Sequence, residues 1–147
     1  HIIGNNNNYY SKKLLNEIRT YKLQDFITFT GVISNVSEYL SNMDIGLMLS
    51  KNEAFGRVTI EYMFQNIAVI ASNTGANKEL IENHKTGLIY DFNNIEMLAQ
   101  AIIKLCKDKN LLLELASQGK KYALDNYTSE RNSKQIYELY TKILDKD

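Results

Sequence analysis

Two glutamates, Glu53 and Glu61, bracket a Phe-Gly step in the stretch NEAFGRVTIE. Along a continuous helix their positions would be about 12 Å apart, at about 1.5 Å per residue. Two carboxyl groups that act on one glycosidic bond lie roughly 5 to 9.5 Å apart, so this pair is poorly placed for that chemistry. A longer ligand with hydroxyls at both ends and a diphosphate in the middle, such as a nucleotide sugar, fits the spacing better.

Two unrelated surface acids are the alternative interpretation of this pair. Glu61 lies between Ile60 and Tyr62 in the apolar stretch VTIEYMF. An unpaired carboxylate buried in such a stretch would be costly. That context favours a binding role for Glu61.

The residues between the two glutamates predict an anion site at a helix N-terminus. A helix that begins near Phe55 or Gly56 leaves several backbone amides without intrahelical partners, including those of Arg57 and Val58. Such amides bind phosphate groups. Gly56 has no Cβ and lets a ligand approach the backbone closely, although a plain turn glycine is at least as probable on this residue alone.

Alternating strand and helix patterns predict the fold that positions these residues. The apolar runs at 45–50 and 67–72 are typical of parallel strands buried on both faces. We expect a doubly wound, Rossmann-like parallel α/β sheet, followed after Asn93 by a helical C-terminal tail. The other expected strands are 1–4, 26–30 and 87–91, and the expected helices are 9–23 with a cap at Asn7 or Asn8, 34–43 with a cap at Ser34 or Asn35, 55–66, 76–83, 94–108, 109–127 and 129–146.

Ligands of open α/β sheets bind outside the carboxyl ends of the strands. Three loops of this sequence follow strands in that way, at 4–8, 50–56 and 72–77. The third loop contains Gly75 and leads to Glu79, which either lines a site or only complements a helix dipole, at about even odds. We expect the three loops to meet at one edge of the sheet.

Composition narrows the class of protein. The 147 residues carry 17 basic and 17 acidic side chains, so no overall field attracts nucleic acid. Apolar runs are shorter than the roughly 20 residues of a membrane-spanning helix. Cys106 follows the apolar phase of its helix and is expected to be a buried structural thiol. A single cysteine cannot form an internal disulfide, so we expect a cytoplasmic protein. His1 and His84 have no partners at metal-ligand spacing, so we expect no metal site.

The order of these motifs resembles the C-terminal, donor-binding domain of GT-B fold, family-four (group 1) retaining glycosyltransferases. The resemblance rests on FITFTGVI, VSEYLSNMDIGLMLS, the two glutamates seven residues apart around Phe-Gly, VIAS, TGANKEL and GLIYD, and it covers nearly the whole chain. It implies a hexosyltransferase of polysaccharide biosynthesis with a nucleotide diphosphate sugar as donor and no cofactor. The acceptor would be a saccharide or a lipid-linked saccharide. The resemblance is also compatible with peripheral contact between the parent protein and the inner face of the membrane.

The resemblance also implies a role for each matching residue. Glu53 would be the catalytic-site residue that faces the donor hexose, and Glu61 would hold the ribose. The other expected donor-binding residues are Phe55, Gly56 and Arg57 along the diphosphate, Val32 and Ile33 at the base, and Gly4 and Gly75 on the phosphate side.

The match has departures that limit what this stretch could do alone. The usual Gly-x-Pro before VIAS is Asn66-Ile67-Ala68, and the usual Gly-Gly is Gly75-Ala76. The family's Arg and Lys that neutralise the diphosphate would precede His1. We therefore expect residues 1–147 to be one nucleotide-sugar-binding domain that lacks its first strand and the N-terminal acceptor domain, inactive by itself. A nucleotide-sugar epimerase of the same architecture and a non-catalytic flavodoxin-like module are the alternatives.

Overall fold

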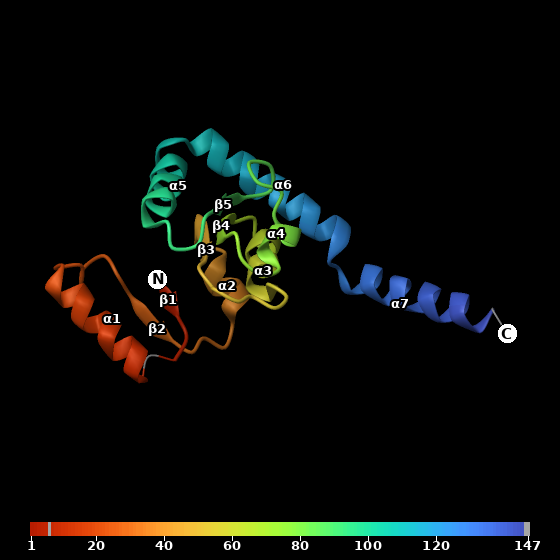
Figure 1. The fold of residues 1–147 in the computed structure, drawn as a ribbon, viewed down its shortest axis with the longest axis horizontal. Coiled ribbons are helices and arrows are strands. Elements are labelled where there is room, and N and C mark those ends of the chain that lie inside the picture. Colours follow the sequence, from red (N-terminus) through yellow and green to blue (C-terminus); the bar gives the residue numbers. More distant parts are fainter. Residues whose placement is uncertain (6, 146–147) are drawn as a thin grey trace. The chain divides into compact units, whose positions relative to one another are not determined.

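The computed structural model describes residues 1–5 and 7–145 of the 147 residues. The chain divides into two compact units, His1–Tyr39 and Leu40–Asp147. Figure 1 gives the order of the elements along the chain.

The first unit is a short parallel β-α-β arrangement. Strand β1 (Ile2–Ile3) pairs with β2 (Phe29–Gly31), and α1 (Tyr9–Thr20) connects them. Asn8 caps α1, because its side-chain oxygen accepts the Ser11 N–H at 2.8 Å while the Ser11 hydroxyl accepts the Asn8 N–H at 3.0 Å. The cap predicted at Asn7 or Asn8 is therefore confirmed at Asn8.

The strand predicted at 26–30 begins later than the sequence indicates. The backbone N–H groups of Phe26 and Ile27 both donate to the carbonyl of Leu23, at 3.1 Å. These bonds hold the two residues in a turn after α1, so only Phe29–Gly31 pairs with β1. Local hydrogen bonding at the helix end has overridden the β propensity of the run.

The second unit contains a three-stranded parallel sheet in the order β3-β4-β5. Helix α2 (Val36–Leu40) lies at the boundary between the units, and the Glu38 N–H donates to the Asn35 side chain at 3.3 Å, as expected for a cap. The remaining elements are β3 (Ile45–Met48), α3 (Arg57–Phe64), β4 (Ala68–Ser72), α4 (Asn77–Leu80), β5 (Leu88–Tyr90), α5 (Ile95–Lys107), α6 (Lys109–Asn126) and α7 (Ser129–Leu144).

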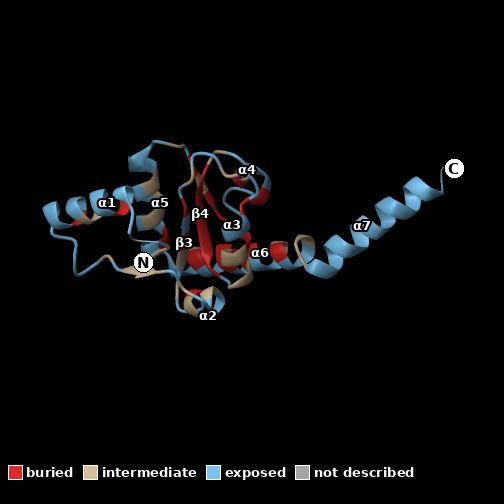
Figure 2. Ribbon diagram, turned by 90° about the horizontal axis from the view of Figure 1, so that it is seen from below, coloured by how far each residue is buried: buried red, intermediate tan, exposed pale blue. Residues whose placement is uncertain are grey.

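Strand β4 is buried on both faces, as its continuous apolar sequence predicts (Figure 2). Val69 and Ala71 pack into a cluster with residues of α3, α4 and α6, whereas Ala68 and Ile70 pack into a second cluster with residues of α5 and α6. Helices thus cover both faces of the sheet. The prediction of a doubly wound parallel α/β fold with a helical C-terminal tail is confirmed.

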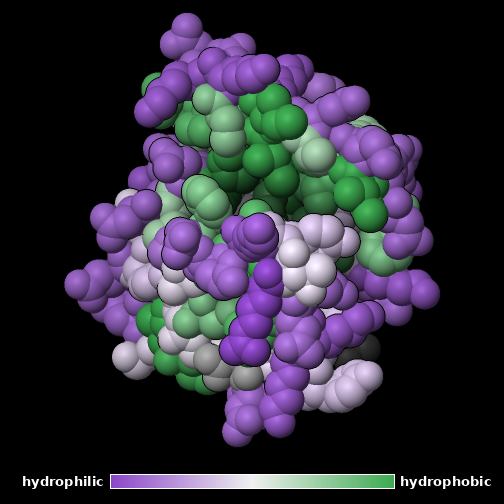
Figure 3. All heavy atoms as spheres, turned by 90° about the vertical axis from the view of Figure 1, so that its left-hand side faces the viewer, coloured by the Kyte–Doolittle hydropathy of each residue, from purple (hydrophilic) through white to green (hydrophobic). Residues whose placement is uncertain are grey.

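Apolar surface stays uncovered in the second unit. Strand β3 pairs only with β4 among the described residues, and Leu47 and Leu49 at its end are exposed, as are Ile95 and Ile103 of α5. Figure 3 shows hydrophobic side chains gathered in its upper part. No described helix is long and apolar enough to cross a membrane.

Helix α7 has no buried residue over its described length (Figure 2). The sequence predicts this helix at 129–146, and its last predicted residue lies outside the described residues.

Cys106 is exposed, so the prediction of a buried thiol is wrong. Its neighbour Leu105 is the fully buried residue of α5. Successive helix residues are turned by about 100°, which places Cys106 beyond the edge of the buried face.

A glycine in β3 makes room for an aromatic ring on α3. A Cβ at Gly46 would lie within 2.8 Å of three ring carbons of Tyr62. We expect Gly46→Ala to lower the free energy of unfolding by about 1 to 3 kcal/mol, because the ring must move. In a Tyr62→Ala background the same change should cost much less, and a double-mutant cycle by chemical denaturation measures the difference. An equal cost in both backgrounds would contradict this packing.

Candidate functional site

The loop after β3 ends at Gly56, the N-cap residue of α3, and the Glu53 side chain binds the backbone amide of Gly56. Gly56 has a left-handed backbone with φ of 81°, and its N–H donates to Glu53 Oε1 at 2.9 Å. Helix α3 begins at Arg57, one residue after Gly56 and two after Phe55, the two predicted starts. The Gly56 amide therefore already has an acceptor, whereas the first-turn amides of Arg57 and Val58 have no acceptor within the helix.

The loop after β4 packs directly against the Glu53 loop. The Ala76 N–H donates to the Glu53 carbonyl at 3.0 Å. A Cβ on Gly75 would lie 2.9 Å from the backbone nitrogen of Glu53 and closer still to its carbonyl oxygen. Two of the three predicted loops therefore meet at one edge of the sheet.

Gly75 is required at its position for two reasons, its φ of 55° and this close approach. We expect Gly75→Ala to cost about 2 to 4 kcal/mol of unfolding free energy, from left-handed strain and steric overlap together. Gly31→Ala is the control, because Gly31 has φ of 72° with nothing within 4 Å of its Cβ position. Chemical denaturation should show a clearly smaller loss for Gly31→Ala, and equal losses would contradict the steric argument.

A buried polar network fixes the start of the Glu53 loop to β4. The hydroxyls of Ser72 and Thr74 both donate to the Ser50 carbonyl, at 2.8 and 2.7 Å. Asn77 is fully buried and accepts the Thr59 hydroxyl at 3.2 Å, which ties α4 to α3. Because buried polar groups that are all paired rigidify their surroundings, the network holds the loops in register.

Two adjoining pockets surround the N-terminus of α3. The first, called here the Glu53 pocket, has a volume of about 400 Å³ and is lined by Glu53, Phe55 and Gly75 among others. The second, called here the α3–α7 groove, has a volume of about 700 Å³ and is lined on α3 by Arg57 and Glu61. Phe55 lines both.

The structure thus brings together six of the nine predicted site residues within the second unit: Glu53, Phe55, Gly56, Arg57, Glu61 and Gly75. The other three, Gly4, Val32 and Ile33, lie in the first unit. Val32 is exposed and Ile33 half-buried. The Gly4 N–H donates to the carbonyl of Gly31 at 2.9 Å.

Glu61 is half-exposed, so it does not bear the burial cost that its apolar neighbours indicated. Its side chain is 44% exposed, and Oε1 lies 3.8 Å from the Arg57 guanidinium one turn earlier. Such an exposed pair is worth little by itself. The Glu61 carboxylate is therefore accessible to a ligand.

Burial, with the negative charge of Glu61 as the smaller cause, raises the pKa of Tyr62 above its ordinary value.

Glu79 keeps both of its predicted roles. It lies in the first turn of α4, where a carboxylate complements the helix dipole, and it also lines the Glu53 pocket.

Sequence reasoning missed Tyr127, which lines both pockets. Burial, a hydrogen bond with Tyr122 and the nearby charges of Tyr122 and Glu79 raise the pKa of Tyr127 to about 12. The phenol is therefore neutral near pH 7 and retains its proton. Tyr127 follows the end of α6 and belongs to no motif, so no local signal marked it.

The described residues contain no group of three or more His, Cys, Asp or Glu side chains that could hold a metal ion. The ring of His1 is instead in hydrogen-bonding contact with the Tyr39 hydroxyl, within the first unit.

Comparison with known proteins defines the class. The family of group 1 glycosyl transferases matches residues 1–122, and the chain belongs to that family. N-acetyl-alpha-D-glucosaminyl L-malate synthase of Bacillus anthracis is 27% identical over 91% of this chain and 35% of its own length.

Solved structures of the same kind support the fold. A glycosyltransferase from Rickettsia africae has a TM-score of 0.89 and 28% identity, over 97% of this chain and 39% of its own. Anabaena Alr3699/HepE, crystallised with UDP, has a TM-score of 0.90 and 23% identity, over 95% of this chain and 40% of its own. The chain therefore spans well under half the length of these relatives.

Proposed function

We propose that the chain is the donor-binding part of a retaining glycosyltransferase that moves a hexose from a nucleotide diphosphate sugar to a saccharide or lipid-linked acceptor. The observation that carries the proposal is the position of Glu53 and Glu61 in two adjoining pockets that share Phe55 and Tyr127, next to the start of α3. Carboxylates accept hydrogen bonds from sugar hydroxyls, and free helix-start amides suit the phosphates between them.

Each residue has a defined part in this proposal. Glu53 faces the hexose and the reacting centre, and Glu61 holds the ribose. The backbone of Phe55, Gly56 and Arg57 at the start of α3 follows the diphosphate through its amides, while the Arg57 side chain pairs with Glu61. Gly75 keeps the two loops in contact. In the first unit, Gly4 faces the phosphates while Val32 and Ile33 face the base.

The remaining parts of the enzyme belong to a longer protein in this proposal. The partial coverage of the relatives supports this view, and so does β3, which has a partner on one side only among the described residues. A preceding strand, a basic pair for the diphosphate and an acceptor domain would complete the enzyme, and residues 1–147 alone would be inactive. The rate enhancement of glycosyl transfer would come from positioning of the substrates and from electrostatic stabilisation of the leaving diphosphate.

Titration of the full-length protein with UDP, GDP and ADP and their sugars tests the proposal. One nucleotide should raise the melting temperature, since a ligand at about 100 times its Kd adds about 2.7 kcal/mol of stability. UDP comes first because the Anabaena structure contains it. Sugar transfer should require an acceptor. If no nucleotide binds, the proposal is wrong. Nucleotide release without an acceptor would instead indicate the epimerase.

A further inference from the structure

The α3–α7 groove has a second wall that the proposed donor roles do not use. Helix α7 contributes Asn132 and Gln135, and the segment before it contributes Asn126 and Thr128. The volume of about 700 Å³ lies within the range of small-molecule pockets, roughly 300 to 1,000 Å³.

The charge of the groove argues against a phosphate here. Arg57 and Glu61 are the charged residues among those that line it, and they lie 3.8 Å apart. Their opposite charges offset each other, so the groove has little net field to attract an anion. A neutral ligand fits this lining better.

The polar groups on α7 match hydroxyl groups. Thr128 accepts the Arg131 N–H, and Asn126 donates to the Tyr122 carbonyl, so both are already engaged. Asn132 and Gln135 are three residues apart on one face of α7, and their side-chain amides make no hydrogen bond among the described residues. An amide both donates and accepts, as does a sugar hydroxyl.

Apart from Ser129, the rest of the lining is apolar and aromatic. Phe55, Ile60 and Phe64 come from α3 and its cap, and Tyr127 lies at the end of α6. A mostly apolar pocket with a few convergent polar groups is the usual form of a ligand site. The apolar C–H faces of a sugar ring could rest on these side chains.

We infer that the α3–α7 groove binds a neutral polyhydroxylated ring, held by the Glu61 carboxylate on one wall and by the amides of Asn132 and Gln135 on the other. The inference rests on the proposed function for the source of the ring, which is the ribose of the nucleotide donor or a sugar of the acceptor. It adds α7 to the proposed site and assigns Asn132 and Gln135 as binding residues.

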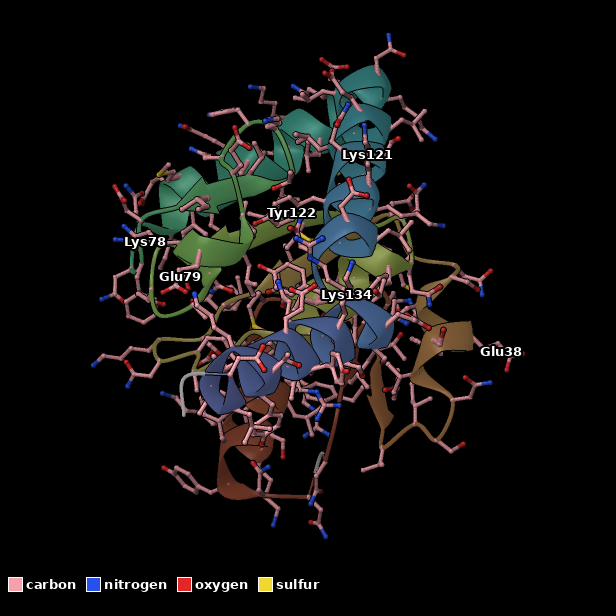
Figure 4. The ribbon with its side chains drawn as sticks, turned by 90° about the vertical axis from the view of Figure 1, so that its right-hand side faces the viewer. Glu38, Lys78, Glu79, Lys121, Tyr122 and Lys134 are labelled. Atoms are coloured by element: carbon pink, nitrogen blue, oxygen red, sulfur yellow. The ribbon has the colours of Figure 1, made fainter. Side chains whose placement is uncertain are left out.

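The double variant Asn132→Ala/Gln135→Ala tests the inference in the full-length protein. Lys134→Ala is the matched control, because Lys134, labelled in Figure 4, lies between them in the sequence of α7. Lys134 pairs with Glu138 at 3.9 Å and does not line the groove. The probes are UDP, 2′-deoxy-UDP and the monosaccharides glucose, mannose and N-acetylglucosamine, followed by calorimetry and by NMR of the side-chain amides.

If the ring is ribose, the double variant binds UDP about tenfold more weakly, and its preference for UDP over 2′-deoxy-UDP is smaller than that of the wild type. If it is another sugar, UDP binding is unchanged, and a monosaccharide shifts the Asn132 and Gln135 amide signals. If a monosaccharide shifts these amide signals but no nucleotide binds, the proposed function is wrong, and the groove is still supported as a sugar-binding site. If the double variant and Lys134→Ala behave alike with every probe, and no monosaccharide shifts these signals, the inference is overturned.

Discussion

Replacing Glu53 by Gln is expected to slow glycosyl transfer by the full-length enzyme on the order of 100-fold. In the structure one carboxylate oxygen, Oε1, accepts the Gly56 N–H, and no described residue hydrogen-bonds to Oε2. The Gln side-chain oxygen can still accept the Gly56 N–H, so the loop should keep its conformation. In the proposed arrangement, the variant loses the negative charge next to the reacting centre and one hydrogen-bond acceptor for the donor hexose.

Kinetic and binding measurements on Glu53→Gln separate these effects. The kcat should fall while the Kd for the free nucleotide stays nearly unchanged, because the nucleotide does not reach Glu53 in the proposed arrangement. Glu53→Ala should in addition lose about 1 kcal/mol of stability, because the Gly56 N–H loses its hydrogen bond to the carboxylate. A Glu53→Gln enzyme with the wild-type kcat would remove Glu53 from the reacting centre.

Replacing Glu61 by Ala is expected to weaken nucleotide binding between about 10-fold and 100-fold. A hydrogen bond to a charged group contributes about 1.5 to 3 kcal/mol, and the Glu61 carboxylate can accept two ribose hydroxyls. The loss of its ion pair with Arg57 should change stability by well under 1 kcal/mol, because the Arg57 side chain is largely exposed and that of Glu61 is half-exposed. The variant therefore tests binding without a large change in folding.

Much of the fold was predictable because a strand that is buried on both faces has a continuous apolar sequence. The continuous apolar run before Asn73 predicted β4, and burial of β4 on both faces followed from it. The end of α1 was less predictable, because Phe26 and Ile27 satisfy their amides through the carbonyl of Leu23. Whether these two amides bond to the Leu23 carbonyl or to a neighbouring strand depends on the backbone geometry at the end of α1, which residue type does not encode.

The candidate site was predictable only in part. Residue types and spacing identified the Glu53 loop and the start of α3, which lie where expected. The bond from the Gly56 N–H to Glu53 depends on a left-handed backbone and one side-chain rotamer, so it could not be foreseen. Tyr127 and Asn132 reach the pockets through the path of α6 and α7, and no nearby motif marks either residue.

Calorimetric titration of Glu61→Ala beside Glu138→Ala tests the donor site most directly. Glu138 is a matched control, since it forms a similar exposed pair with Lys134, at 3.9 Å, and lines neither the Glu53 pocket nor the α3–α7 groove. We predict that the full-length Glu61→Ala protein binds its nucleotide at least about tenfold more weakly than wild type, while Glu138→Ala binds like wild type. Equal affinities for wild type and Glu61→Ala would contradict the proposed donor site.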